Sequence, residues 1–277
     1  MLRSMDELDD YAIRATDGVI GHVKDFYFDD KKWVVRYFIV ETGNWLSSRK
    51  VLISPMAVSD PSWEDKVLPV SITREQVKNS PDIDTEKPVS RQHEMRYLGY
   101  YGYPYYWAGL GLWGGGAYPF MMMPDFAGVE PILDAGQVQA EKAYAQAEGE
   151  RHRDDDPHLR SCKAIIDYHI NATDGDIGHV QGLLVDEETW AIRYLIVNTS
   201  NWWLGHEVLV SPQWIDNVSW PDAVVSLKLT RQEVRDAPSY DSQVHLNREQ
   251  EIGVHEHYGR VGYWTNEVKS EPATPRR

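Results

Sequence analysis

Two groups of polar residues in the 277-residue sequence are of types that could support chemistry. His255 and His257 stand two positions apart, and on a strand their imidazoles would share one face and could bind a metal ion or a small ligand. Asp29 and Asp30, with acidic counterparts at 186–188, could act as general acid and base if a cleft held them together. These patterns raise two hypotheses, a metal- or ligand-binding site and an acid hydrolase.

The same residues also fit structural roles, which we favour. Two histidines are fewer than the three or four ligands that zinc usually takes. Residues 29–32 are typical of a hairpin turn open to water, where acids are common. We therefore expect no catalytic residues, no cofactor and no metal site, and we interpret the protein as non-enzymatic.

Arg36 and Arg193 occupy the middle of predicted strands, on faces that are otherwise apolar. An unpaired charge buried there would cost several kcal/mol, so each guanidinium must find an acid or reach solvent. We expect an ion pair with a turn aspartate such as Asp17 or Asp174, and a ligand contact is the alternative.

The stretch TDGVIGHV, residues 16–23, places Gly18 and Gly21 three positions apart. A dinucleotide fingerprint needs a third glycine and a P-loop needs a closing Gly-Lys-Ser/Thr, and neither is present. The stretch recurs as TDGDIGHV in the second half, with Gly175 and Gly178 at the matching places. Asp-Gly favours a tight turn, and a glycine in the following strand suits a bulge or a barrel corner, so we predict a structural role for these glycines.

An internal repeat organises the whole chain. Subtracting 21 from 178, the positions of two matching glycines, gives an offset of 157, and this offset aligns the two halves without a gap over about 95 residues. Such a period indicates duplication of a whole domain rather than a short-period solenoid. The matched pairs include Arg36 and Arg193, Tyr37 and Tyr194, Trp45 and Trp202, Pro81 and Pro238, Tyr106 and Tyr263, and Trp107 and Trp264.

Each copy has the pattern of β-strands. Residues 19–28 and 33–40 are rich in β-branched and aromatic residues and flank a turn, which predicts a hairpin. Both faces of the second run are apolar, which suits a small closed barrel with something packed outside it. Shorter runs at 51–53 and 67–72 predict further strands, and residues 73–76, like their counterparts in the second copy, have the capping-box pattern of a short helix.

The motifs TDGVIGHVKDFYFDD, KWVVRYFIVETGNWL and KVLISP, which recur in the second half, resemble the PRC-barrel family. That family includes the cytoplasmic domain of the photosynthetic reaction centre H subunit, whose pattern these motifs resemble more closely, and the C-terminal domain of a ribosome maturation factor. The resemblance implies a small β-barrel that serves as a docking or scaffolding module without a shared catalytic site. It also implies a link to a membrane-associated electron-transport complex.

The predicted protein is therefore mainly β, with two small PRC-type β-barrels that are each followed by a short helix. We expect the first barrel domain at residues 5–95 and the second at residues 157–265. Residues 96–156 are predicted to form a Gly- and aromatic-rich linker with a helix at about 135–151. The two barrels are expected either to pair within the chain or to form a homo-oligomer.

The linker begins with a stretch that carries no charge, residues 97–124. It is long enough to span a membrane, but its glycines and prolines would leave backbone groups unsatisfied in lipid, so we expect no spanning helix. One interpretation is a flexible linker whose aromatic side chains pack partly onto the barrels, and the other is an exposed contact patch for a protein or a membrane surface. The candidate structural or interaction residues in it are Tyr105, Tyr106, Trp107 and Trp113.

Charge and cysteine content limit the partners and the compartment. The net charge of -15 would repel phosphates, so we expect no nucleic-acid partner. The single cysteine, Cys162, excludes an internal disulfide, and the N-terminal residues lack the apolar run of an export signal. We expect a cytoplasmic scaffold that binds a protein partner, peripheral to the inner membrane, with Trp45 and Trp202 as further candidate structural or interaction residues.

Overall fold

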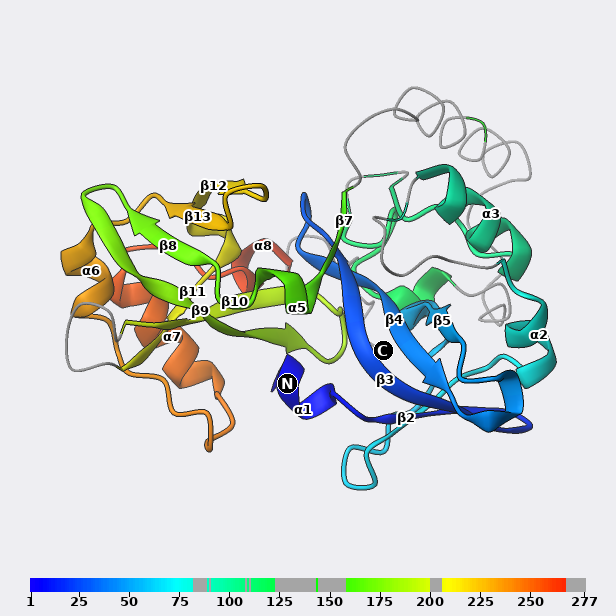
Figure 1. Ribbon diagram of the computed structural model, residues 1–277. Helices are drawn as coiled ribbons and strands as arrows, with labels where there is room; N and C mark the ends of the chain where they lie inside the picture. The colour runs from blue at the N-terminus through cyan, green and yellow to red at the C-terminus, as the bar shows by residue number, and fades with distance from the viewer. Residues whose placement is uncertain are drawn as a thin grey trace, which may run out of the picture. The chain divides into compact units, whose positions relative to one another are not determined.

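The chain divides into two units, which we name after the repeat that supplies most of their residues (Figure 1). The computed structural model describes residues 1–81, 89, 91–107, 109, 111–122, 143, 158–199 and 206–267. The first-repeat unit contains Met5–Ala164 and Asp186–Ile192. The second-repeat unit contains Met1–Ser4, Ile165–Val185 and Arg193–Arg277.

The first-repeat unit is built on a six-stranded sheet with the order β5-β4-β3-β2-β6, and β7 pairs with β3. Its strands are β2 (Ala12–Ala15), β3 (Gly18–Asp29), β4 (Val34–Thr42), β5 (Lys50–Ile53), β6 (Val67–Pro69) and β7 (Leu159–Ser161). The predicted hairpin is confirmed, since β3 and β4 pair antiparallel with Phe26 opposite Phe38 and Tyr27 opposite Tyr37. Every residue from Val34 to Val40 is buried, as expected for a strand with two apolar faces.

The second-repeat unit repeats this arrangement with a seven-stranded sheet, in the order β11-β10-β9-β8-β13-β12 with β1 paired to β9. Its strands are β1 (Leu2–Ser4), β8 (His169–Ala172), β9 (Gly175–Asp186), β10 (Ile192–Asn198), β11 (Glu207–Val210), β12 (Ile215–Ser219) and β13 (Val224–Leu227). The long strands β9 and β10 are the counterparts of β3 and β4 at the offset of 157.

The strand pairing leaves both sheets open, whereas the sequence predicts closed barrels. In the first-repeat unit the hydrogen-bonded path ends at β5 on one side and at β6 on the other. β6 has three residues, and Pro69 at its end lacks the backbone N–H that another strand would need. The isolated bridge between Val58 and Val70 adds to the pairing without closing a ring. The mainly β class is therefore confirmed, while closure into barrels is not seen in the described residues.

Short helices accompany the strands of each unit. The α-helices are α1 (Met5–Leu8), α2 (Arg74–Asn79), α3 (Arg91–Tyr101), α5 (Cys162–Ile165), α6 (Arg231–Arg235), α7 (Arg248–His257) and α8 (Trp264–Glu267). The 3-10 helices are η1 (Asn44–Leu46), η2 (Pro55–Ala57), η3 (Pro119–Met122) and η4 (Pro212–Trp214). Both predicted capping boxes are confirmed: Thr73 and Gln76 cap α2 reciprocally, and Thr230 and Glu233 cap α6. The helix predicted at 135–151 lies outside the described residues apart from Ala143.

Two backbones approach closely at Gly21. A Cβ atom at this position would lie 1.9 Å from the carbonyl oxygen of Glu41, and the register between β2 and β3 shifts beside it. Gly178 has the same relationship to the carbonyl oxygen of Asn198. Gly18 has a φ of 143°, as a glycine in a tight turn does. The predicted turn and bulge therefore explain these glycines.

Several aromatic side chains of the uncharged stretch belong to the core, whereas Tyr100 and Phe120 are each 41% exposed. Tyr103, Tyr106 and Trp113 are buried in the first-repeat unit, and the Trp113 indole N–H donates to the carbonyl of Thr189 at 2.7 Å. A buried tryptophan or tyrosine stabilises a fold most when its indole N–H or hydroxyl also forms a hydrogen bond. The contact-patch interpretation is therefore wrong for these residues, while Tyr105 and Trp107 are half-buried.

The first strand of each repeat belongs to the sheet of the other repeat. Both strands read Leu-Arg-Ser, at residues 2–4 and 159–161, and they match at the offset of 157. β1 pairs with β9 in the second-repeat unit, and β7 pairs with β3 in the first-repeat unit. Each sheet is thus completed by a strand from the other half of the sequence.

Candidate functional site

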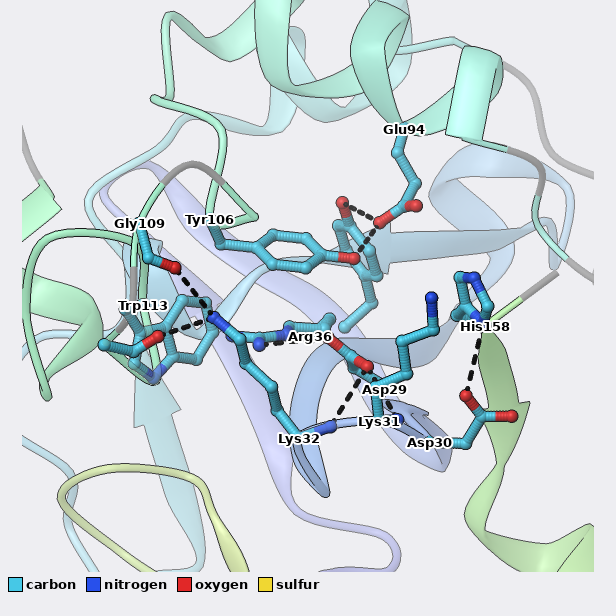
Figure 2. Close-up of polar contacts among 12 residues, drawn as sticks. Asp29, Asp30, Lys31, Lys32, Arg36, Glu94, Tyr106, Gly109, Trp113 and His158 are labelled. Carbon is cyan, nitrogen blue, oxygen red and sulfur yellow. Dashed lines mark hydrogen bonds and ion pairs between the residues drawn. The ribbon is translucent and has the colours of Figure 1, made fainter. Parts of the chain in front are cut away.

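Charged and aromatic side chains gather in the core of the first-repeat unit (Figure 2). We call them the Arg-Glu-Tyr cluster and define it by Arg36 and Tyr37 on β4, Arg91 and Glu94 on α3, and Tyr106 in the segment after α3. Four of the five are exposed by 3% or less, and Arg91 is half-buried. The cluster therefore joins a strand, a helix and the aromatic segment through polar contacts shielded from water.

Glu94 lies at the centre of this cluster. Its carboxylate accepts hydrogen bonds from the hydroxyls of Tyr106 and of Tyr37, the latter at 3.4 Å, and pairs with the Arg91 guanidinium at 3.0 Å. Burial raises the pKa of Glu94 to about 7, although Arg91 and the Tyr106 hydroxyl act in the opposite direction. The buried carboxyl group of Glu94 therefore keeps its proton to a higher pH than an exposed glutamate does.

Arg36 is enclosed by aromatic rings. Its guanidinium carbon lies 3.9 Å from the ring centre of Tyr106 and 4.7 Å from that of Trp113, and its Nη2 lies 3.2 Å from Asp29 Oδ2. Its Nε and Nη1 atoms are buried and have no hydrogen-bond partner among the described residues. The ring faces, which are electron-rich, supply part of the stabilisation that water would give a free guanidinium.

Two expectations about Arg36 and its partner are corrected here. The partner is Asp29 rather than Asp17, whose carboxylate instead accepts the backbone N–H of Arg74 at 2.8 Å. Asp29 is also 5% exposed and not open to water, because it folds back and accepts the N–H of Lys31 at 3.0 Å. Burial alone would raise the pKa of Asp29, but the Arg36 charge and the backbone donors hold it below its ordinary value.

Lys32 extends this polar region toward the glycine-rich segment. Its ammonium donates to the carbonyl oxygen of Gly111 at 2.6 Å and to that of Gly109 at 3.4 Å (Figure 2). Burial lowers the pKa of Lys32, and the Arg36 charge lowers it further. The turn between β3 and β4 thus ties the aromatic stretch to the sheet.

An open hollow lies elsewhere on the same unit, with a volume of about 310 Å³. It is lined by Asp17, Trp45, Arg74, Glu75, Lys78 and Asn79. The Trp45 indole N–H donates to the carbonyl of Ile20 at 2.6 Å, and the Arg74 guanidinium lies 4.2 Å from its ring centre. Trp45 is therefore fixed at the wall of an accessible hollow, whereas Trp202, its counterpart, lies outside the described residues.

Residues 4–77 match the family model of the PRC-barrel domain. The first repeat carries a PRC-barrel domain. No curated protein matches the chain. The match includes the turn glycines, Arg36 and Trp45, and it ends before α3, so Arg91, Glu94 and Tyr106 lie beyond the matched residues.

The Arg-Glu-Tyr cluster recurs in the second-repeat unit at the offset of 157. Its members are Arg193, Tyr194, Arg248, Glu251 and Tyr263. Glu251 accepts the hydroxyls of Tyr194 at 3.1 Å and Tyr263 at 2.7 Å and pairs with Arg248 at 3.1 Å. The Arg193 guanidinium lies 4.0 Å from the Tyr263 ring centre, close to the 3.9 Å of the first cluster.

Three of the five members of this cluster were identified in the sequence, whereas Arg91 and Glu94 were not. Arg36, Tyr37 and Tyr106 stand out as matched positions, but Glu94 and Arg91 do not, because they lie in a polar helix without a recognisable motif. The signal is present: RQHE at 91–94 matches REQE at 248–251 at the same offset. Comparing the helices position by position would have singled out the Arg and Glu.

His255 and His257 lie on helix α7 rather than on a strand, because Asn247 and Gln250 form a capping box ahead of them. Residues two positions apart on a helix point in different directions. His255 is buried with its Nε2 3.0 Å from the Tyr194 hydroxyl, whereas the exposed His257 has its Nε2 2.8 Å from the carbonyl of Glu233. The two imidazoles therefore do not share a face, and no cluster of three metal-ligating side chains occurs among the described residues.

Within the residues that the structure describes, no helix is both long enough and apolar enough to cross a bilayer.

Proposed function

We propose that the protein is a non-enzymatic docking scaffold made of two PRC-type domains, the second inferred from the internal repeat. The observation that carries this proposal is the burial of the Arg-Glu-Tyr cluster. Its carboxylate, tyrosines and central arginine are exposed by 3% or less and are bound to one another. General acid-base catalysis needs such groups within reach of a substrate, so this arrangement supports a structural role.

We place the docking contact at the hollow beside Trp45. Aromatic and arginine side chains at an accessible surface are the usual anchors of protein interfaces. Trp45 is held by its hydrogen bond to the carbonyl of Ile20, and the Arg74 guanidinium lies against the Trp45 ring, 4.2 Å from its centre, so both side chains are positioned before a partner arrives. Preorganised side chains lose less conformational entropy on binding.

The motif resemblance to the reaction centre H subunit supports a more specific version. In this version the partner is a protein of a membrane-associated electron-transport complex, and the scaffold works in the cytoplasm at the inner membrane. The net charge of -15 favours a basic region of a protein over an anionic lipid surface as the contact.

A site-specific photo-crosslinker tests the docking proposal. We would place p-benzoylphenylalanine at Lys78, on the rim of the hollow, in the full chain expressed in its native cell. The matched control carries the same crosslinker at Val244, which is 50% exposed on the second-repeat unit. We expect one membrane-complex protein to be crosslinked from Lys78 and not from Val244.

A charge-reversal variant then tests whether the hollow carries the affinity. Lys78→Glu should tighten binding of the identified partner, because it replaces a positive charge with a negative one opposite the partner's basic region, whereas Lys228→Glu on the other unit should leave the binding constant unchanged; both are measured by titration with purified complex. Both lysines are exposed, so the two substitutions should leave stability almost unchanged. Crosslinking that is equal at Lys78 and Val244, or unchanged binding by Lys78→Glu, would contradict docking at the hollow.

A further inference from the structure

The edge of β3 holds a strand that the second repeat supplies. β7 pairs antiparallel with the C-terminal end of β3, with Ser161 opposite Tyr27, Arg160 opposite Phe28 and Leu159 opposite Asp29. Leu159 and Cys162 are buried at 2% and 3% exposure, so the segment is part of the core of the first-repeat unit. Backbone pairing together with alternate buried side chains is how a sheet edge binds an added strand.

Three aspartates of the first repeat bind the polar groups of this segment. Asp30 pairs with Arg160 Nε at 3.0 Å, and its other oxygen lies 3.5 Å from His158 Nδ1. Figure 2 shows His158, the residue before β7, directed at Asp30. The edge of β3 therefore fits a segment that has a basic residue opposite Phe28.

The other two aspartates hold the end of the same segment. Asp25 accepts the hydroxyl of Ser161 and the backbone N–H of Lys163, the latter at 3.2 Å. Asp9 pairs with the Lys163 ammonium at 3.0 Å. Without this segment Asp25, whose pKa is raised by burial, would keep the backbone N–H of Phe26 but lose the donors of Ser161 and Lys163.

We propose that the β3 edge with Asp9, Asp25 and Asp30 is a strand-binding site that accepts residues 158–164 from a second copy of this chain as well as from its own. The strand comes from the other repeat, so the hydrogen bonds and ion pairs formed are the same whichever copy provides it. The first strand of the first repeat completes the other sheet in the same way, so two copies can exchange both strands reciprocally.

Covalent linkage favours the strand of the same chain, because a tethered segment has an effective concentration of about 1 mM or more. The dimer in which two copies exchange these strands therefore becomes the major form when a substitution destabilises binding of the strand to its own chain but not to the other chain. This proposal goes beyond the docking function, and it involves neither Lys78 nor the hollow.

Two complementary charge reversals create that situation. Asp30→Arg would place a second guanidinium opposite Arg160 of the same chain, and Arg160→Asp would place a second carboxylate opposite Asp30. When the two variants are mixed, exchange restores an opposite-charge pair in the heterodimer, between the arginine introduced in one chain and the aspartate introduced in the other. The double variant D30R/R160D restores the pair within one chain and is the matched control.

The measurement uses full chains labelled with a donor or an acceptor dye, refolded together from urea and separated by size with mass detection. We expect a heterodimer with energy transfer from the mixture only, and monomers from wild type and from the double variant. A mixture that yields only monomers, although each variant folds, would overturn the proposal. If a single variant does not fold alone, a folded heterodimer recovered only from the mixture supports the proposal, and recovery of no folded protein contradicts it.

Cys162, the single cysteine, reports the state of the segment independently. We expect modification of its thiol to be about tenfold faster or more in each single variant than in wild type, because the segment opens more often. Protection should return in the mixture and in the double variant. Unchanged protection in the single variants would show that the aspartates do not hold the segment.

Discussion

Arg36 Nη2 lies 3.2 Å from Asp29 Oδ2, with the arginine side chain fully buried and the aspartate side chain 8% exposed. The pair joins the middle of β4 to the turn that precedes it. Because two guanidinium nitrogens lack hydrogen-bond partners within the described part of the chain, the neighbouring rings of Tyr106 and Trp113 and Asp29 together must offset the loss of hydration.

Removing the acid of this pair should destabilise the protein strongly. Asp29→Asn leaves Arg36 charged and buried, which typically costs about 3–5 kcal/mol. Arg36→Met combined with Asp29→Asn should cost less than Asp29→Asn alone, since no uncompensated charge remains. Urea unfolding followed by fluorescence measures both variants, and a larger loss in the double variant would contradict this account.

The raised pKa of Glu94 predicts a pH dependence of stability. Because the folded pKa of about 7 lies above the ordinary 4.5, the folded state favours the protonated form. This contribution is complete below pH 4.5 and is lost as the pH rises through 7. The groups that act on Glu94 are Arg91 of α3, Tyr106, and Asp29 and Arg36 from the sheet side.

We therefore expect the unfolding free energy of wild type to decrease as the pH rises from about 5 to 8, and we expect this decrease to be absent in Glu94→Gln. The control is wild type at the same pH values, with the Glu94 carboxyl titrated directly by carbon-13 NMR. A carboxyl midpoint at or below the ordinary value for glutamate would show that the ion pair with Arg91 outweighs burial.

Gly21 and Gly43 provide a matched pair of substitutions. Gly21→Ala would place a methyl group 1.9 Å from the Glu41 carbonyl oxygen, and we expect a loss of about 2 kcal/mol or more as the strands separate. No atom of the described residues lies within 4 Å of a Cβ at Gly43, so Gly43→Ala should change stability by about 0.5 kcal/mol or less. Equal effects, measured by thermal unfolding, would contradict the close approach of the backbones.

His255 stands where the first repeat has the buried Leu98. Burial lowers the pKa of His255, so its contribution to stability is present above the ordinary value of 6.5 and is lost as the pH falls below it. His255→Leu should change stability by about 1.5 kcal/mol or less at pH 8 and should reduce the loss on acidification. Urea unfolding at pH 8 and pH 5 measures both effects, and an equal loss on acidification in the variant and in wild type would contradict this role of His255.

The positions of His255 and His257 also predict how the protein responds to added metal. Zinc or nickel should leave the melting temperature of wild type unchanged, because the two imidazoles are held by Tyr194 and Glu233 in different directions. A rise in melting temperature that is lost when both histidines are replaced by alanine would restore the metal-site hypothesis.

Local features were predictable because they depend on residues close together in the chain. The Asp-Gly turns, the hairpin of β3 and β4 and the Thr73 and Thr230 capping boxes follow from period, turn chemistry and caps. The internal repeat also determined which residues occupy equivalent places. These signals do not depend on how distant segments pack.

Only the tertiary structure decided the pairings between distant segments. The carboxylate of Glu94 meets Tyr37 and Tyr106 because α3 packs on the sheet, and no local pattern specifies that contact. Likewise, Leu-Arg-Ser at 159–161 is an ordinary short strand in the sequence, which does not say whose sheet it joins. The position of a three-residue strand depends on the sheet edge that forms hydrogen bonds with its backbone and on the acidic side chains beside that edge. Both exist only in the folded chain.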